Sequence, residues 1–308
     1  KRCQTVYRTD VMPKLVDTSY LAPRRIGEGI LFGRFGWLFY TGNNSISYYK
    51  GTNLLSDEKL AEYADTTTRL NDLCKERGIQ LYLLFCPNKE QVYSEYMPTY
   101  EIDTDYKRTS RLVDYINENT EITAVYPLEE LKAADFYWQT YYQYDTHWNS
   151  TGAFVGLQVL YKAMGRTTIN QLELDGETIP AQLNSNFNLG GIDPSNYSPD
   201  FEFRFTYKPE ITVEGMNSKN VCKMTSDSEN SEQLVLLGDS FRIMMLEYLG
   251  KDYAKASVAH RDYVASLKKE ILKCDVLILQ AVERYDARTF TLMDTLIEYF
   301  EQDKENGK

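Results

Sequence analysis

Three residue types, histidine, aspartate and serine, occur in a pattern that indicates where this chain could do chemistry. Of its 308 residues only two are histidines, and one of them, His147, follows Asp145 by two positions. About ninety residues later the apolar run 234–237 ends in Gly-Asp-Ser, which places Ser240 after a tight turn. A serine hydroxyl is a weak nucleophile until a base takes its proton, and a histidine base needs a carboxylate to fix its tautomer. The sequence therefore predicts a catalytic set of Ser240, His147 and Asp145.

Each of these residues also has a plainer interpretation. Ser240 could cap the helix that follows it, His147 could be a packing or surface histidine, and Asp145 could be a turn or cap residue. The other histidine, His260, also follows an expected strand and is a rival base at the same sheet edge. We favour the catalytic interpretation because both halves of the set occur in one chain. We expect Asp239 to be structural, accepting backbone N–H bonds within the turn.

A serine that attacks an acyl group needs donors for the negative charge that develops on the acyl oxygen. The backbone N–H groups of Ser240 and Phe241 are the nearest donors, because both residues lie at an expected helix start. A second donor could come from Gly190-Gly191 or from the loop 259–263. The sequence leaves both sources of the second donor open.

Polar residues follow several expected strands, where α/β proteins place their ligands. Asn88 and Lys89 follow one strand, Arg284 follows another, and Arg242 lies beside the serine. We expect these side chains to face one crevice, where each could contact substrate or serve as a local cap or ion-pair partner. Trp148, next to the histidine, could form a wall for sugar stacking or anchor the loop in the core.

Both halves of the catalytic set resemble motifs of a known family. Gly238-Asp239-Ser240 resembles the nucleophile block of the SGNH hydrolases. The preceding Asp145-Thr146-His147-Trp148 resembles the Asp-x-His-Trp of permuted SGNH-like proteins that O-acetylate exported polysaccharides, the alginate O-acetyltransferases and their Gram-positive DHHW relatives. Thr146 replaces the first histidine of the family name, but the carboxylate and the base remain. Further similar stretches, within roughly residues 30 to 290, are Gly36-Trp37-Leu38-Phe39-Tyr40, Phe85-Cys86-Pro87-Asn88-Lys89 and Val282-Glu283-Arg284-Tyr285.

The resemblance implies a serine-dependent O-acetyltransferase that acts on an exported polysaccharide through an acetyl-Ser240 intermediate, without a cofactor. The acetyl group would come from a membrane-bound acetyl-transfer partner and pass to a hydroxyl of the polysaccharide acceptor. A carbohydrate acetylesterase, or a non-catalytic polysaccharide-binding or assembly protein on the same fold, is the alternative. The resemblance also implies an extracellular or cell-surface protein. Since the chain begins with Lys1 rather than methionine, an N-terminal leader or membrane anchor could have been trimmed.

Composition argues against other classes of protein. The chain has 34 basic and 45 acidic residues, a net charge of −11 and a pI near 4.9, whereas nucleic-acid binding needs clustered Lys and Arg. We therefore expect no nucleic-acid partner. The five cysteines include no Cys-x-x-Cys pair and two histidines cannot complete a usual Cys/His cage, so we expect no metal site. Cys86 and Cys274 fall in or beside apolar runs and are expected to be buried.

Strands and helices alternate along the chain, which predicts a three-layer α/β sandwich with a mostly parallel sheet, the SGNH-hydrolase-like fold of the resemblance. We expect an N-terminal arm at 1–25 and one SGNH-like catalytic domain at 26–308. A polar, Gly- and Pro-containing stretch at about 172–232 predicts an insertion of loops and short strands beside the site. The expected elements are a hairpin at 26–49, helices at 56–77, 105–118, 150–164, 263–273 and 289–300, and strands at 79–86, 122–126, 233–237, 256–259 and 276–280.

Overall fold

A seven-stranded sheet forms the middle of the molecule. This computed structural model describes residues 24–25, 29–103, 107–166, 172–180, 201–207, 211–216 and 220–306. The strands of the sheet are β4 (Gln80–Cys86), β5 (Thr123–Val125), β8 (Val213–Glu214), β9 (Val221–Ser226), β10 (Gln233–Gly238), β11 (Lys255–His260) and β12 (Val276–Val282). Their order is β5-β4-β12-β10-β11-β9-β8. The first five run parallel, β9 runs antiparallel to β11, and β8 pairs antiparallel with β9, so the mostly parallel sheet predicted from the sequence is confirmed.

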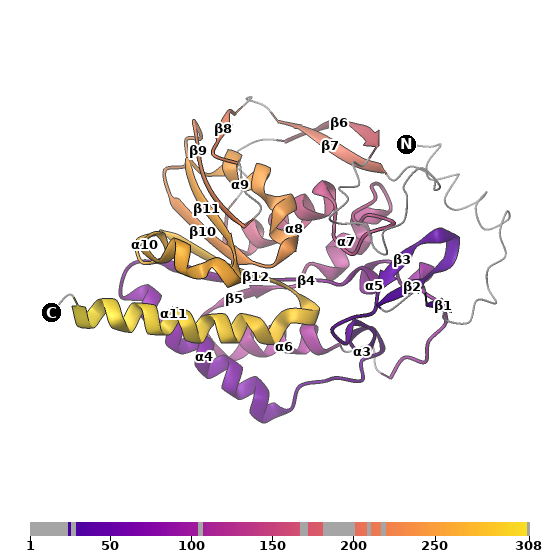
Figure 1. Ribbon diagram of the computed structural model, residues 1–308, viewed down its shortest axis with the longest axis horizontal. Helices are drawn as coiled ribbons and strands as arrows, with labels where there is room; N and C mark the ends of the chain where they lie inside the picture. The colour runs from indigo at the N-terminus through magenta and orange to yellow at the C-terminus, as the bar shows by residue number, and fades with distance from the viewer. Residues whose placement is uncertain are drawn as a thin grey trace.

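Helices cover both faces of this sheet and complete a three-layer α/β sandwich (Figure 1). The helices are α3 (Ser45–Lys50), α4 (Asp57–Lys75), α5 (Lys89–Val92), α6 (Arg108–Asn119), α7 (Leu128–Asp135), α8 (Ser150–Ala163), α9 (Leu246–Asp252), α10 (Lys268–Ile271) and α11 (Asp286–Asn306). Helices α4, α6 and α11 pack together on one face, and α8 and α9 contact strands from the other. The predicted fold class is therefore confirmed.

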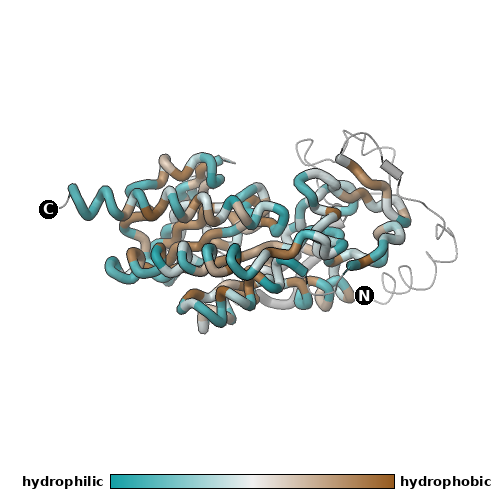
Figure 2. Tube along the Cα trace, turned by 90° about the horizontal axis from the view of Figure 1, so that it is seen from below, coloured by the Kyte–Doolittle hydropathy of each residue, from teal (hydrophilic) through white to brown (hydrophobic). Residues whose placement is uncertain are grey.

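The central strands are apolar because both of their faces are covered. Along β10, Leu234 and Leu236 join the core cluster of the α8 face, whereas Val235 and Leu237 join the cluster of the α4 and α11 face. Every residue of β12 is buried, as is typical of the middle of a parallel sheet. Figure 2 shows hydrophobic segments through the middle of the molecule and the hydrophilic last turns of α11 at the C-terminal end.

The ends of the helices follow local rules that the sequence shows. Helix α4 begins after Ser56, whose hydroxyl accepts the backbone N–H of Lys59 at 3.3 Å. The chain turns after the helix at Gly78, which has a φ of +73°. The expected boundaries of this helix, 56–77, therefore agree with the structure within two residues.

The hairpin expected at 26–49 is wrong in its second half. A three-stranded antiparallel sheet is formed by β1 (Arg24–Arg25), β2 (Ile30–Phe32) and β3 (Leu38–Tyr40), and α3 follows it. Asn43 and Asn44 have φ angles of +52° and +59°. Their left-handed conformation, which asparagine tolerates, turns the chain into the helix rather than into a returning strand.

The stretch expected to be an insertion has two different parts. Strands β6 (Leu172–Pro180) and β7 (Phe201–Tyr207) form a separate two-stranded sheet. Strands β8 and β9 instead extend the central sheet beside β11. The central sheet therefore resumes at β8, earlier in the chain than residue 233, where the sequence predicted that it would resume. Most of the expected N-terminal arm, 1–23, lies outside the described residues. Among those described, no helix is both long and apolar enough to cross a membrane.

Candidate active site

Ser240 lies where β10 ends, at the carboxyl edge of the sheet. Gly238 is the last residue of the strand, and a Cβ atom there would lie 2.2 Å from Gln280 Oε1 of the neighbouring strand. A larger residue here would displace the Gln280 amide, which is hydrogen-bonded to Asp239. Asp239 is the N-cap of the 3-10 helix Ser240–Met245, so Ser240 is the first helical residue.

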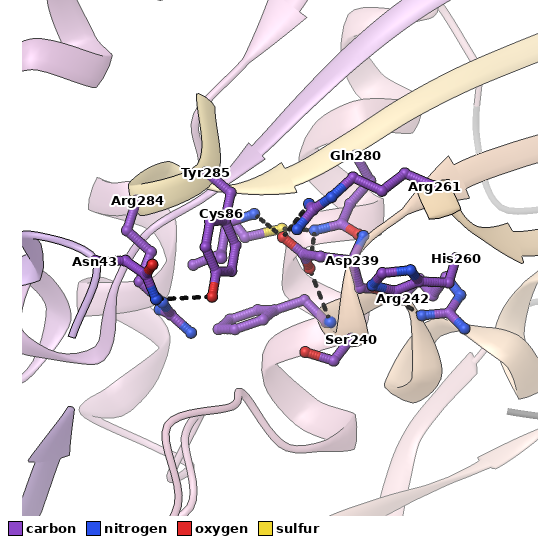
Figure 3. A network of polar contacts seen from close by, with 12 residues as sticks. Asn43, Cys86, Asp239, Ser240, Arg242, His260, Arg261, Gln280, Arg284 and Tyr285 are labelled. Carbon is purple, nitrogen blue, oxygen red and sulfur yellow. Dashed lines mark hydrogen bonds and ion pairs between the residues drawn. The ribbon is translucent and has the colours of Figure 1, made fainter. Parts of the chain in front are cut away.

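The carboxylate of Asp239 holds this turn in place. Its Oδ1 accepts hydrogen bonds from the backbone N–H of Phe241 at 3.0 Å and from Gln280 Nε2 at 3.1 Å. Its Oδ2 accepts the backbone N–H of Val282 at 2.7 Å. Figure 3 shows the carboxylate beside Gln280, with the Ser240 hydroxyl pointing away from it. The prediction that Asp239 is structural is confirmed.

The fold brings Ser240, His147 and Asp145 together from segments 93 positions apart. His147 Nε2 lies 2.6 Å from Ser240 Oγ, and His147 Nδ1 lies 2.5 Å from Asp145 Oδ1. The same carboxylate oxygen accepts the backbone N–H of His147 at 2.8 Å. This network orients the ring with the Nδ1 hydrogen toward the carboxylate and with Nε2 facing the serine.

The carboxylate of Asp145 is 1% exposed but is stabilised as an anion. Burial by itself raises the pKa of this carboxyl. The hydrogen bonds and charge of His147, with a smaller effect from Lys89, outweigh burial and bring the pKa of Asp145 below its usual value. Asp145 is therefore ionised at neutral pH and can stabilise a protonated His147 ring.

Residues 139–149 form a closed loop that carries this aspartate and histidine. The backbone N–H of Tyr142 donates to the carbonyl of His147 at 3.2 Å, and Asn149 Nδ2 donates to the carbonyl of Gln139 at 2.7 Å. Asn149 also caps α8, because its side-chain oxygen accepts an N–H from the first turn of the helix. The loop is therefore fixed where the helix begins.

Lys89 lies beneath this loop and is completely buried. Its Nζ donates to the backbone carbonyls of Asp145 at 2.5 Å, Tyr142 at 3.0 Å and Gln143 at 3.1 Å. An ammonium group has three hydrogens, and these three carbonyls can accept all of them. The expectation that Lys89 contacts substrate is therefore wrong, because its charge fixes the backbone around Asp145.

Trp148 is also fully buried, so the interpretation of this ring as a sugar-stacking wall is wrong. It anchors the loop in the core, which was the other interpretation. Its Nε1 donates to the carbonyl of Phe241 at 2.8 Å. A Cβ atom at Gly156 would lie 2.7 Å from the indole, so that glycine makes room for the ring. The tryptophan thereby connects the histidine loop with the helix that begins at Ser240.

The remaining residues expected at the crevice make contacts inside the protein. Asn88 Oδ1 accepts a hydrogen bond from Arg284 Nη1 at 2.6 Å, and Arg242 Nη1 donates to the carbonyl of Asp239 at 2.8 Å. Arg242 is 2% exposed, so the expectation that it contacts substrate is wrong. Asn88 is 0% exposed, but its Nδ2 has no hydrogen-bond partner among the described residues, and its contact with substrate stays a prediction. Burial lowers the pKa of Arg242 to about 10. Arg284 keeps some exposure, its guanidinium lies 5.6 Å from the ring of Phe241, and its contact with substrate stays a prediction.

His260 lies at the same edge of the sheet beside Arg242 (Figure 3). Its Nδ1 accepts the backbone N–H of Asp262 at 3.3 Å. Burial lowers the pKa of His260, and the charge of Arg242 lowers it further. The position next to the Ser240 hydroxyl is occupied by His147, which makes His147 the base that this geometry favours.

Of the two backbone N–H groups nearest to the reacting serine, the structure favours that of Ser240 as the donor to the oxyanion. The N–H of Phe241 is engaged by Asp239, whereas the first residue of a helix has no intrahelical acceptor. The second donor stays open. Gly190-Gly191 lies outside the described residues, and in the loop 259–263 the N–H of His260 donates to a backbone carbonyl.

The described residues contain no group of three or more His, Cys, Asp or Glu side chains placed to hold a metal ion. The cysteines among them, Cys74, Cys86, Cys222 and Cys274, are buried free thiols, which confirms the expected burial of Cys86 and Cys274. Burial raises the pKa of Cys274 to about 12 and leaves this thiol protonated at neutral pH. Ser240, which has His147 beside it, is therefore a better candidate for the nucleophile than this buried thiol.

Sequence comparisons relate the chain to known acetyltransferases. A family model described as "SGNH hydrolase-like domain, acetyltransferase AlgX" matches residues 30–192, more than half of the chain. This match includes Asp145 and His147 and ends before Ser240. A curated relative, "Probable alginate O-acetylase AlgJ" of Pseudomonas putida, is 29% identical over 145 residues, which are 46% of this chain and 35% of the relative. The chain thus matches about a third of the length of that relative.

Solved structures share the fold at low sequence identity. Bacillus cereus PatB1 with a sulfonyl adduct has a TM-score of 0.59 at 14% identity, covering 87% of this chain and 99% of that one. The O-acetyltransferase domain of Pseudomonas putida AlgJ has a TM-score of 0.53 at 19% identity, with the same coverage. A DHHW family protein from Eubacterium siraeum has a TM-score of 0.55 at 12% identity, covering 92% and 97%. With the matching family model, these observations show that the chain belongs to the AlgX-type family of SGNH hydrolase-like acetyltransferase domains.

Proposed function

We propose that this protein is a serine-dependent O-acetyltransferase that acts on an exported polysaccharide through an acetyl-Ser240 intermediate. One observation carries the proposal, which is the continuous chain of hydrogen-bond contacts from Asp145 through His147 to the Ser240 hydroxyl. Family membership supports acetyl transfer as the reaction, and the name of the AlgJ relative supports a polysaccharide as the acceptor.

The first half of the reaction forms the acetyl-enzyme. Ser240 Oγ attacks the carbonyl carbon of the acetyl donor while its proton moves to His147 Nε2. Asp145 stabilises the imidazolium that results, and the N–H of Ser240 donates to the oxyanion. The donor's leaving group then departs with the proton from His147.

The second half releases the acetyl group to a sugar. A hydroxyl of the acceptor gives its proton to His147 Nε2 and attacks the acetyl carbon on Ser240. The bond to Ser240 breaks, and the serine oxygen recovers the proton from the histidine. Water in place of the sugar would complete an esterase reaction, so the occupancy of the acceptor position determines which reaction occurs.

The setting of this reaction follows from the same proposal. An acetyl group for an exported polysaccharide must reach the protein outside the cytoplasmic membrane, so we propose an extracellular or cell-surface location. A membrane-bound acetyl-transfer partner would supply the group to Ser240.

Product analysis separates the three possible functions. Purified protein is mixed with p-nitrophenyl acetate and with either a β-1,4-glucan or an alginate hexasaccharide, and acetylated sugar and free acetate are quantified by mass spectrometry. We expect acetylated oligosaccharide from the wild type and none from Ser240→Ala. Release of free acetate without any acetylated sugar, in the presence of either oligosaccharide, would identify an acetylesterase. Absence of both products, with an oligosaccharide bound, would identify a non-catalytic binding protein.

A further inference from the structure

Two consecutive aromatic residues after α7 are unusually exposed. Phe136 and Tyr137 are 66% and 62% exposed, more than any other large hydrophobic side chain of the described residues. The other exposed examples, such as Leu54 and Met216, are dispersed along the chain and need no explanation. Adjacent exposed rings of this size are an unusual feature that points to a ligand.

The exposed pair is held on a clamped loop. The hydroxyl of Tyr93, a fully buried residue, donates to Asp135 Oδ1 at 2.5 Å on one side of the pair. On the other side, the same hydroxyl oxygen accepts the backbone N–H of Thr140 at 2.8 Å. Both ends of the loop are thus fixed to one buried side chain. A ligand that binds there meets preorganised rings and loses less conformational entropy.

Two more rings continue this surface. The ring of Tyr137 lies 5.8 Å from that of Trp138, and Trp138 lies 5.7 Å from Phe203 of β7. Strand β7 is held above α8, because Thr151 Oγ1 donates to the carbonyl of Phe203 at 2.9 Å (Figure 1). We call Phe136, Tyr137, Trp138 and Phe203 the aromatic platform.

The platform leads directly into the loop that carries the base. The residue after Trp138 is Gln139, whose carbonyl accepts a hydrogen bond from Asn149, two residues beyond His147. Chain geometry therefore places Gln139 within about 15 Å of His147. Trp138 precedes Gln139 by one residue, so the same geometry places it within about 20 Å of His147, a distance that an extended oligosaccharide can span while one of its hydroxyl groups lies at Ser240.

We propose that the aromatic platform binds the acceptor glycan, as a subsite for neutral or weakly charged pyranose units; this inference rests on the proposed function. A pyranose ring presents C–H groups on its face, which pack against the electron-rich face of an aromatic ring. The last turn of helix α7, beside the platform, carries Lys132, which is paired with Glu129, and Asp135, which accepts the Tyr93 hydroxyl. With its lysine paired and a net charge of −11 on the whole chain, this surface disfavours an anionic membrane surface and a polyanionic sugar.

A protein partner fits the platform less well than a sugar does. Stable protein interfaces bury about 800 Å² on each partner, whereas two exposed rings offer only about 150–250 Å² each when fully buried. Such an area suits a weak subsite that positions one or two sugar rings.

Binding can be measured without catalysis in the Ser240→Ala protein. Of the three tryptophans, Trp37 and Trp148 are 4% and 0% exposed, so a ligand on the surface should affect the fluorescence of Trp138. We expect a β-1,4-glucan hexasaccharide to change this fluorescence with little dependence on salt. The Phe136→Ala/Tyr137→Ala double variant should weaken the binding about tenfold or more, whereas the Leu54→Ala/Ile102→Ala variant, which alters exposed aliphatic residues, should not.

Kinetics give a second readout in the protein with Ser240 intact. The double variant should raise the KM for the oligosaccharide acceptor about tenfold and leave the hydrolysis of p-nitrophenyl acetate unchanged. Unaltered glucan binding by the double variant would overturn the inference. So would tight, salt-sensitive binding of an alginate hexasaccharide alone, or platform-dependent binding of anionic lipid vesicles without glucan binding. Since the fluorescence assay needs no acetyl transfer, failure of the proposed reaction would be seen separately, as an absence of acetyl on Ser240.

Discussion

Both histidines of this protein lie at the carboxyl edge of one sheet, and each is two residues from an aspartate. In the first pair Asp145 is 1% exposed and accepts both the Nδ1 contact at 2.5 Å and the backbone N–H of His147. In the second pair the side chain of Asp262 is 65% exposed and lies 3.3 Å from His260 Nδ1. The spacing is the same, but the burial of the carboxylate differs.

The surroundings of the two rings have opposite effects on protonation. A base must gain a proton in the transition state, and a buried carboxylate stabilises the protonated ring. His260 has an exposed aspartate, which contributes little in water, and it faces the cations Arg242 and Arg261. The comparison shows that a His–Asp spacing in a sequence does not identify a base until the burial of its partner is known.

The largest expected effect comes from removing the serine or its base. Ser240→Ala and His147→Ala should each lower acetyl-ester turnover by about 10³-fold or more, and combining them should add little because the residues act as a unit. His260→Gln should keep activity of the same order as the wild type. The measurement is steady-state turnover of p-nitrophenyl acetate, with folding checked by circular dichroism. Loss of turnover in His260→Gln, with His147→Ala active, would reverse the comparison.

Replacing each aspartate by asparagine should show how the two His–Asp pairs differ in catalysis. Asp145→Asn should lower turnover on the order of 10²- to 10⁴-fold, because an amide cannot hold the imidazole in the required tautomer or stabilise the imidazolium. Asp262→Asn makes the same chemical change at an exposed position and should have little effect. Equal losses in the two variants, measured as kcat, would show that burial of the carboxylate is not the distinguishing feature.

Lys89 supports the first histidine loop from below, and its removal should cost both stability and rate. Lys89→Met leaves three backbone carbonyls without their donor, which should lower the free energy of unfolding by about 1–3 kcal/mol. Because Asp145 is displaced, kcat should also fall, whereas KM for the small ester should change little. Lys59→Met removes a partly exposed lysine and is the matched control. Urea unfolding and ester kinetics of both variants test this prediction; a Lys89→Met protein with the control's stability and kcat would contradict it.

The smallest effect concerns the charge of His260. Burial and Arg242 hold its pKa below the usual 6.5, so NMR titration should show this ring losing its proton below that pH. Asp262→Asn removes the carboxylate that opposes the shift and should lower the pKa further. A lowered pKa in the folded state gives a stability contribution that is present above about pH 6.5 and is lost as the pH falls through the folded value. With only two histidines, His260→Gln assigns the signal, and a titration above 6.5 would contradict the account.

The sequence predicted the positions that chemistry restricts most. Ser240, His147 and Asp145 could be chosen because histidine is scarce, and the parallel strands could be located because both of their faces are apolar. These are properties of the residues themselves. The contact between His147 and Ser240 depends on how the chain packs, but the two family motifs in the sequence already indicated that these residues meet.

What the sequence could not show depends on which way a polar side chain points. Lys89 and Trp148 follow or adjoin the expected site, yet both turn inward, where Lys89 bonds backbone carbonyls and Trp148 fills space left by glycines. Gln280, which holds Asp239 in place, was not among the residues predicted for the site. One signal was available, since it is the only polar residue of the buried strand β12 and such a group needs partners. Those partners are the side chain and backbone of Asp239.

The most direct test of the central claim is to locate the acetyl group on the protein. The protein is mixed with p-nitrophenyl acetate, quenched in acid within the first turnovers, digested, and mapped by mass spectrometry. The account predicts acetyl on Ser240 in the wild type and in His260→Gln, slow accumulation in His147→Ala, and none at this position in Ser240→Ala. Acetyl on a different residue, with turnover unchanged in Ser240→Ala, would contradict it.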